Sequence, residues 1–203
     1  MTRSDVQLML DVKAGDSESF GLLLRRYRTP LVNFLYRMVR DTATAEDLAQ
    51  EVFLRVYRAR KQYAPSAKFT TWMFRIATNL ALNSIRDNRH HQMETSIDAP
   101  VGDEDSAPME LPSRELRIDE HMVERDRCDV IRKAISSLPE KQRVAVLLHK
   151  YEEMDYGEIA KILDCSESAL KSLLFRAYET LRVQLAPLVA QPVRTSAGEG
   201  RAS

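Results

Sequence analysis

Apolar residues recur at intervals of three and four along most of the chain, which is the spacing of one helix face. Two long stripes of this kind run from Ser17 to Arg40 and from about Thr70 to His91. Further helices are predicted from Thr44 to about Lys61, from Ile118 to Ser136, after Pro139, from Tyr156 to Leu163 and from Ser166 to about Leu185. No strand-like alternation competes with them, so we expect an all-α fold.

One internal stretch lacks any helical period. Residues 97–114 contain Pro100, Pro108 and Pro112 and four acids between Asp103 and Glu110. Such a segment has too little apolar surface to offset the entropy lost on ordering. We therefore expect two small helical domains, residues 1–93 and 118–186, joined by an acidic flexible linker over 94–117 and followed by a flexible tail over 187–203.

The formal net charge of zero hides a strong asymmetry along the chain. Residues 18–91 hold 13 Lys and Arg against 6 Asp and Glu, a net of +7, whereas residues 92–127 hold 4 against 11, a net of −7. A basic block next to an acidic connector favours contact between the first domain and nucleic acid.

Composition also bears on the cellular setting. Two cysteines cannot form a disulfide framework, which favours a reducing, cytoplasmic compartment. No apolar run approaches the length of a membrane span, and the charged first fifteen residues do not resemble a secretory signal. We expect a cytoplasmic protein without membrane insertion.

The most specific local pattern is a helix-turn-helix near the C-terminal end. A short helix, a tight turn at Asp164 and a longer helix fit this motif. On the longer helix, Leu170, Leu173, Leu174, Ala177 and Leu181 share the face predicted to be buried. The opposite face presents Ser168, Lys171, Ser172, Phe175 and Arg176, which suit phosphate and base-edge contacts in DNA. The alternative is an ordinary helical hairpin with a solvated polar face.

The helix from Thr70 to His91 carries a second candidate surface. Trp72, Arg75, Asn79, Asn83 and Arg86 fall within a sector of roughly 80° at 100° per residue, as does His90. An aromatic ring can stack on an unpaired base, amides can read base edges, and guanidinium groups can hold phosphates. The alternative is that Trp72 belongs to the core and the polar residues are solvated.

The helix from Thr44 to Lys61 has a different outer face. Asp47, Gln50, Glu51 and Leu54 form an acidic strip around an exposed apolar side chain, a poor surface for DNA. It could dock a basic protein helix. The alternative to protein docking is a solvated face on which acidic residues pair with Arg55 of the same helix.

Three segments in this order resemble sigma factors of the extracytoplasmic-function (ECF) group of the sigma-70 family of bacterial RNA polymerase: AEDLAQEVFLRVYRA (45–59), FTTWMFRIATNLALNSIR (69–86) and LPEKQRVAVLLHKYEEMDYGEIAKILDCSESALKSLLFRAYETLR (138–182). The resemblance implies a non-enzymatic subunit without cofactor or metal. Its partners would be core RNA polymerase, through the clamp coiled coil and the flap, promoter DNA and an anti-sigma factor.

The resemblance also implies roles for the three surfaces. The strip around Leu54 matches the segment that docks on the clamp coiled coil. The Trp72–Arg86 column matches the segment that melts and reads the downstream (−10) element, with Asn79 and Asn83 at base-reading positions. The helix from Ser166 matches the reader of the upstream (−35) element. Family members often carry basic residues at the positions of Leu173 and Tyr178. We therefore expect weaker binding of DNA phosphates at these positions.

Two other functions fit parts of the sequence. A free-standing helix-turn-helix regulator would explain the C-terminal half but not the Trp72 column or the Leu54 strip. A metal or thiol enzyme would need the residues His90, His91, His121, Cys128 and Cys165, whose spacing does not complete a ligand set.

Overall fold

The computed structural model describes residues 3–95 and 118–189, and all regular structure in these ranges is helical. The helices are α1 (Asp5–Ala14), α2 (Ser17–Val39), α3 (Thr42–Arg58), α4 (Phe69–Thr95), α5 (Ile118–Ser137), α6 (Glu140–Lys150), α7 (Tyr156–Leu163) and α8 (Glu167–Val189), with one 3-10 turn, η1 (Ala59–Gln62), after α3. The prediction of an all-α fold is confirmed. The expected linker lies almost entirely outside the described residues, as does most of the expected tail.

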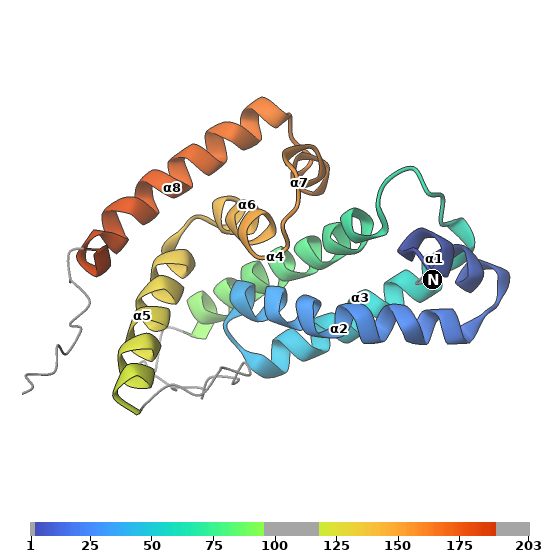
Figure 1. The fold of residues 1–203 in the computed structure, drawn as a ribbon, viewed down its shortest axis with the longest axis horizontal. Helices are drawn as coiled ribbons and strands as arrows, with labels where there is room; N and C mark the ends of the chain where they lie inside the picture. The colour runs from blue at the N-terminus through green and yellow to red at the C-terminus, as the bar shows by residue number, and fades with distance from the viewer. Residues whose placement is uncertain (1–2, 96–117, 190–203) are drawn as a thin grey trace, which may run out of the picture.

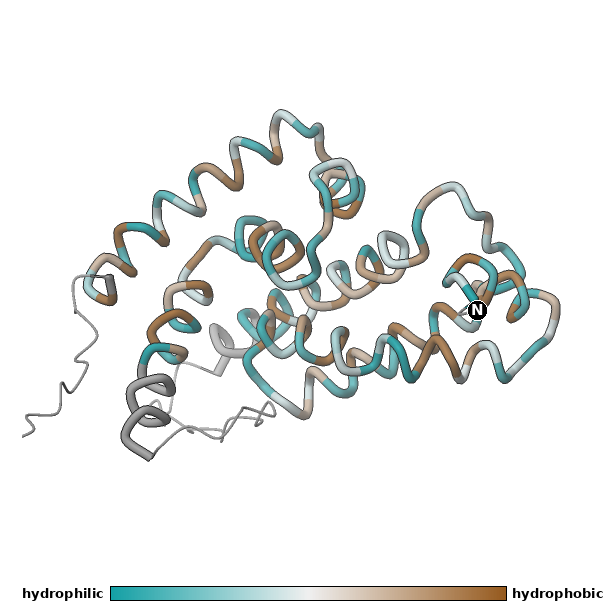
Figure 2. Tube along the Cα trace, in the orientation of Figure 1, coloured by the Kyte–Doolittle hydropathy of each residue, from teal (hydrophilic) through white to brown (hydrophobic). Residues whose placement is uncertain are grey.

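Helices α1 to α4 form one bundle, which we call the N-terminal lobe (residues 3–95; Figure 1). Its core contains the edge-to-face rings of Phe34 and Phe74, whose centroids lie 5.3 Å apart, and the fully buried Leu31 and Met73. Apolar residues follow the inner faces of these helices and polar residues the outer faces (Figure 2). The amphipathic period of α2, α3 and α4 therefore accounts for the bundle.

Helices α5 to α8 form the C-terminal lobe (residues 118–189), which contains the predicted helix-turn-helix. Asp155 and Glu158 make a complete capping box at the start of α7. The turn after α7 depends on Asp164, which adopts a left-handed conformation with φ 52°, and on the Cys165 N–H, which donates to the Ala160 carbonyl at 3.0 Å. Ser166 then caps α8 by accepting from the Ala169 N–H. Each local choice predicted from sequence is present.

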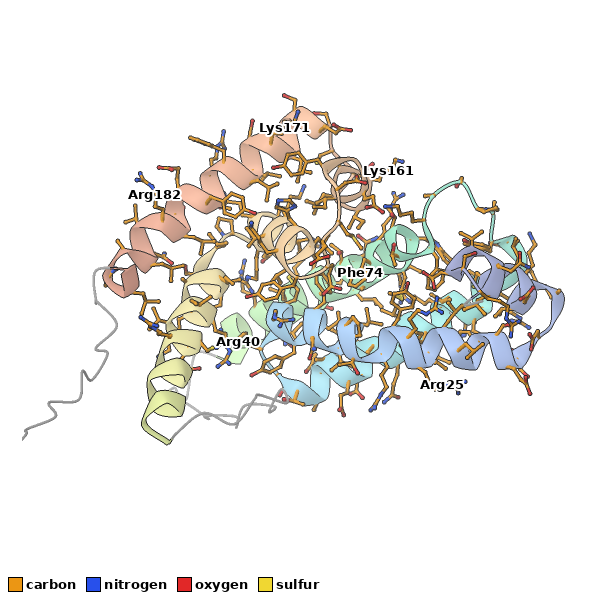
Figure 3. All side chains as sticks on the ribbon, viewed as in Figure 1. Arg25, Arg40, Phe74, Lys161, Lys171 and Arg182 are labelled. Carbon is orange, nitrogen blue, oxygen red and sulfur yellow. The ribbon has the colours of Figure 1, made fainter. Side chains whose placement is uncertain are left out.

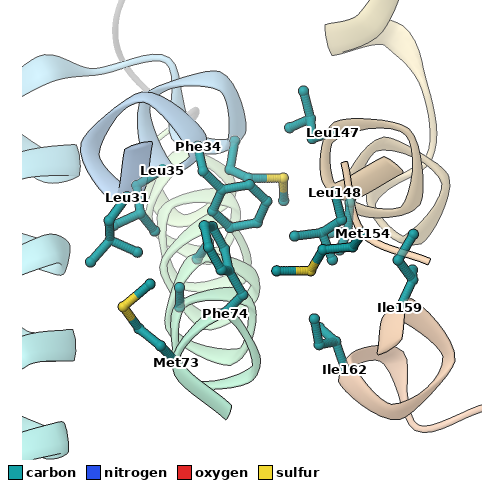
Figure 4. Packing of buried hydrophobic residues seen from close by; sticks show 14 of the residues in the cluster. Leu31, Phe34, Leu35, Met73, Phe74, Leu147, Leu148, Met154, Ile159 and Ile162 are labelled. Carbon is teal, nitrogen blue, oxygen red and sulfur yellow. The ribbon is translucent and has the colours of Figure 1, made fainter. Parts of the chain in front are cut away.

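The two lobes pack against each other, chiefly through α4 against α7 and α2 against α6. Figure 4 shows side chains of α2 and α4 facing those of the C-terminal lobe across one continuous apolar core. This core joins Phe34 and Phe74 to Leu148, Met154 and Ile159. The sequence pattern indicated two lobes but not this contact.

The structure corrects three details of the predicted elements. Helix α1 was not predicted; Ser4 caps it and its buried Leu8, Met9 and Val12 pack it into the bundle. Helix α3 begins at Thr42 rather than Thr44, because the Asp41 carboxylate caps it by accepting from the Thr44 N–H at 2.7 Å. Pro139 occupies the N-cap of α6, one position before the predicted first turn.

Candidate nucleic-acid and polymerase interfaces

The polar column on α4 forms one exposed strip. Arg75, Asn79, Asn83 and Arg86 are all exposed, while Trp72 at the head of the strip is half-buried. On the opposite side of the helix, Met73, Ala77 and Leu80 are buried in the core. The strip therefore presents two amides and two guanidinium groups to solvent, in line with an aromatic ring. The side chain of His90 lies outside the described residues.

A pocket of about 530 Å³ lies at the head of this strip. The segment between α3 and α4 supplies most of its wall, and Trp72 and Arg75 form its side on α4. The lining residues are Ala59, Gln62, Tyr63, Ala64, Ser66, Ala67, Thr71, Trp72, Arg75 and Lys161. This wall was not predicted from the sequence, where its only signal is an aromatic residue, Tyr63, shortly before Pro65.

Three contacts hold the pocket wall in place. The rings of Tyr63 and Trp72 lie with their centroids 5.3 Å apart, and Phe69 meets Trp72 at 6.2 Å from the other side. The Lys13 ammonium of α1 donates to the Tyr63 carbonyl at 2.7 Å. Burial raises the pKa of Tyr63, and the charge of Asp5 adds to the effect. Helix α1 thus holds the backbone of Tyr63, whose ring packs against Trp72.

The polar face of α8 is also exposed. Ser168, Lys171, Ser172, Phe175 and Arg176 are all solvent-accessible, and Phe175 is 68% exposed. The Ser172 hydroxyl donates to the Ser168 carbonyl at 3.1 Å, which leaves its oxygen able to accept. An exposed phenylalanine among polar side chains is unusual in an ordinary helical hairpin, because it keeps a large apolar surface in water.

The two departures noted on α8 are both half-buried, and Tyr178 packs against the core. Leu173 is half-buried. Tyr178 is also half-buried, its hydroxyl has no hydrogen-bond partner among the described residues, and its ring lies 5.7 Å from the Lys150 ammonium. Neither side chain reaches outward in the way a phosphate-binding group does.

The strip on α3 is exposed but partly self-paired. Asp47 and Gln50 are exposed and Leu54 is 48% exposed. Glu51 accepts from the Arg55 Nε at 2.7 Å, and this hydrogen bond lowers the pKa of Glu51. The intrahelical pair that the spacing allowed is therefore present at Glu51, while Leu54 remains unpacked at the centre of the strip.

The α4 column and its pocket lie together, whereas the other two surfaces lie apart from them. Lys171 on α8 points away from the bundle, and Lys161 on α7 points toward α4 (Figure 3). Among the side chains that the structure describes, no three His, Cys, Asp or Glu residues come close enough to hold a metal ion. Cys128 and Cys165 are free thiols, and the side chains of His90, His91 and His121 lie outside the description.

Comparison with known proteins decides the family. The model of sigma-70 region 2 matches residues 23–91, and that of sigma-70 region 4 matches residues 128–181. The RNA polymerase sigma-H factor of Pseudomonas aeruginosa is 31% identical over 192 residues, covering 92% of this chain and 96% of the relative. The chain belongs to the ECF group of the sigma-70 family.

Further relatives agree with this assignment. The ECF sigma-E factor of Escherichia coli is 30% identical over 187 residues, covering 92% of this chain and 96% of that one. RpoE of Bartonella quintana, solved with the anti-sigma factor NepR, shares the fold with a TM-score of 0.67 at 21% identity, over 83% of this chain and 98% of that chain. CnrH, solved with the cytosolic domain of CnrY, shares the fold with a TM-score of 0.64 at 19% identity, over 89% of this chain and 96% of that chain.

This sigma factor carries regions 2 and 4 in that order, so the match extends beyond a lone helix-turn-helix. A free-standing regulator would account for the region 4 match alone, and that alternative is set aside. Within the described ranges, no helix is both long enough and apolar enough to cross a bilayer.

Proposed function

We propose that this sigma factor directs promoter choice through three separate faces. The Leu54 strip docks on the clamp coiled coil of core RNA polymerase. The α4 column, Trp72, Arg75, Asn79, Asn83 and Arg86, opens and reads the downstream promoter element. The α8 face, Ser168, Lys171, Ser172, Phe175 and Arg176, reads the upstream element. The observation that carries the proposal is the exposed column leading into a pocket beside Trp72.

The pocket gives strand opening a physical basis. Removing a base from the duplex costs a few kcal/mol, which must be recovered by contacts made only to the extruded base. A volume of about 530 Å³ beside an aromatic ring accommodates a nucleobase. Arg75 supports phosphate binding at the rim, and Asn79 and Asn83, one and two turns further along, are placed to contact the adjoining bases.

The α8 face suits a different form of DNA. An α-helix fits the major groove of an intact duplex, where Lys171 and Arg176 can hold phosphates or guanine edges and Phe175 can contact a thymine methyl. The uncharged, half-buried Leu173 and Tyr178 leave this face with few cations. Its affinity alone is therefore expected to be low.

Binding to polymerase allows the two weak DNA contacts, those of the α4 column and of the α8 face, to act together. When both lobes are held at a fixed separation, binding of one element raises the effective concentration of the other. We propose that the chain acts in this way in the cytoplasm, performs no covalent chemistry itself, and is held inactive by an anti-sigma factor, as family membership implies.

Polymerase-dependent DNA binding tests the proposal. Gel-shift titrations of a promoter fragment with the chain alone, core polymerase alone and both together should give a specific complex only with both. A Phe175→Ala variant should lose that complex on duplex DNA, and core polymerase should still bind the variant. Equal promoter affinity with and without polymerase would contradict the proposal.

A further inference from the structure

Glu158 belongs to the capping box of α7, yet it also binds the opposite lobe. It is only 9% exposed, and its Oε2 accepts from the Asp155 N–H at 3.2 Å within the box. Its Oε1 accepts from the Thr71 hydroxyl at 3.0 Å, and its Oε2 lies 3.1 Å from the Lys68 ammonium. Lys68 directly precedes α4 and Thr71 lies in its first turn, so both belong to the N-terminal lobe. The hydrogen bond that the Lys68 ammonium donates to Glu158 raises the pKa of Lys68.

Polar contacts surround the apolar interface between the lobes. The Arg143 guanidinium donates to the Met38 carbonyl at 2.9 Å, across the interface, and to the Ser136 carbonyl of its own lobe at 2.6 Å. The Arg37 guanidinium lies 4.1 Å from the centre of the Tyr151 ring. Arg89 pairs with Glu140 at 3.0 Å. The closed arrangement of the two lobes is therefore held by specific polar contacts as well as by the apolar core.

Closure has a direct consequence for the pocket beside Trp72. Lys161 follows Glu158 by one turn on α7, and its side chain joins Trp72 and Arg75 in the pocket lining. Thr71, which donates to Glu158, lines the same pocket. The C-terminal lobe thus contributes one side chain, Lys161, to the pocket lining, while the face of α8 proposed to read DNA remains exposed.

We propose that the contact of Glu158 with Lys68 and Thr71 is an intramolecular latch that keeps the free sigma factor closed over its own single-strand pocket. Core polymerase opens the latch by holding the lobes apart, and only then can an extruded base enter from the side of α7. This inference rests on the proposed role of the α4 column in binding single-stranded DNA.

Two variants weaken the latch without removing the cap of helix α7. Glu158→Gln keeps a residue that completes a capping box but removes the charge that attracts Lys68. Lys68→Ala removes the partner from the other lobe. Because hydrogen bonds to charged groups are stronger than neutral ones, each variant should raise the open population roughly fivefold. Lys61→Ala, an exposed lysine of η1, is the matched control for loss of one positive charge.

The separation of the lobes can be measured in the full-length chain. Spin labels on cysteines replacing Arg25 of α2 and Arg182 of α8, both exposed, report it by pulsed electron resonance in a Cys128→Ser, Cys165→Ala background. The free protein should show a single narrow distance, which core polymerase lengthens. Both latch variants should add the longer distance without polymerase, and Lys61→Ala should not. The double variant should add little to either single one, because both break the same contact.

Binding of a short single-stranded DNA of mixed sequence supplies a second readout. Lys68→Ala should bind it more tightly than the wild type despite losing a positive charge, whereas Lys61→Ala should bind equally or more weakly. The latch would be overturned by a broad distribution of spin-label distances in the free wild type. It would also be overturned if both latch variants gave the same distance as the wild type. Longer distances in the variants without tighter single-strand binding would keep the latch and instead reject the proposed role of the α4 column.

Discussion

Asn79 offers the sharpest test of the α4 column, because its side chain is exposed and contributes little to the fold. Replacing an exposed residue changes the free energy of unfolding by less than about 0.5 kcal/mol. A lost amide contact to a base is worth about 1–2 kcal/mol, so Asn79→Ala should reduce open-complex formation roughly five- to thirtyfold.

The chain provides a matched control for this variant. Asn88 lies nine residues further along α4, which places it on the opposite side of the helix at 100° per residue. It is also an exposed asparagine. Asn88→Ala removes the same amide from the same helix but leaves the column intact, so it should open promoters like the wild type.

Permanganate footprinting of the holoenzyme measures the opening directly, since it detects unpaired thymines. Asn79→Ala should lose reactivity at the downstream element, while protection of the upstream element persists. Normal reactivity in Asn79→Ala, or an equal loss in both asparagine variants, would refute the assignment of the column. Thermal unfolding of both variants checks that neither change acts through the fold.

Three further outcomes are expected. Leu54→Ala, which removes a side chain that is 48% exposed in the free chain, should weaken core polymerase binding by about 1 kcal/mol, or roughly fivefold, in a fluorescence titration. Phe175→Ala should weaken upstream duplex binding with an unchanged melting temperature, whereas Val183→Ala, an equally exposed apolar residue two turns further along α8, should leave binding unchanged. Burial raises the pKa of Glu152 to about 7, with Arg37 partly opposing the shift, so the folded state favours the neutral carboxyl. The free energy of unfolding should therefore fall by on the order of 1 kcal/mol, allowing for solvent screening, as pH rises from about 4.5 to about 7. Glu152→Gln, which stays neutral, should not show this fall in the free energy of unfolding in denaturant titrations across that pH range. An identical pH dependence in the wild type and in Glu152→Gln would rule out the burial effect.

Helix positions and faces could be predicted from sequence because each depends on local spacing. The period of α4 separated buried Met73 from exposed Asn79, and the turn chemistry of Asp155 and Asp164 located the helix-turn-helix. Helix α1 was missed because it lacks a clear amphipathic pattern of its own, and its packing depends on contact with the bundle. The start of α3 was misplaced because Asp41 and Thr44 are both acceptable caps, and in the structure the Asp41 carboxylate accepts from the Thr44 N–H.

The pocket and the contact between the lobes could not be predicted from local pattern. The pocket wall comes from residues such as Tyr63 and Lys161, which lie far apart in sequence and meet only after folding. The capping role of Glu158 is local to α7, but its bonds to Lys68 and Thr71 span about ninety positions, and no periodicity encodes such a pairing.

The central claim is that the two DNA-reading lobes select start sites only when polymerase holds them. Run-off transcription with core polymerase on genomic fragments, with and without this chain, tests it most directly. We predict discrete transcripts that require the chain and are strongly reduced when Asn79 or Phe175 is replaced by alanine. Transcripts identical with and without the chain would contradict the account.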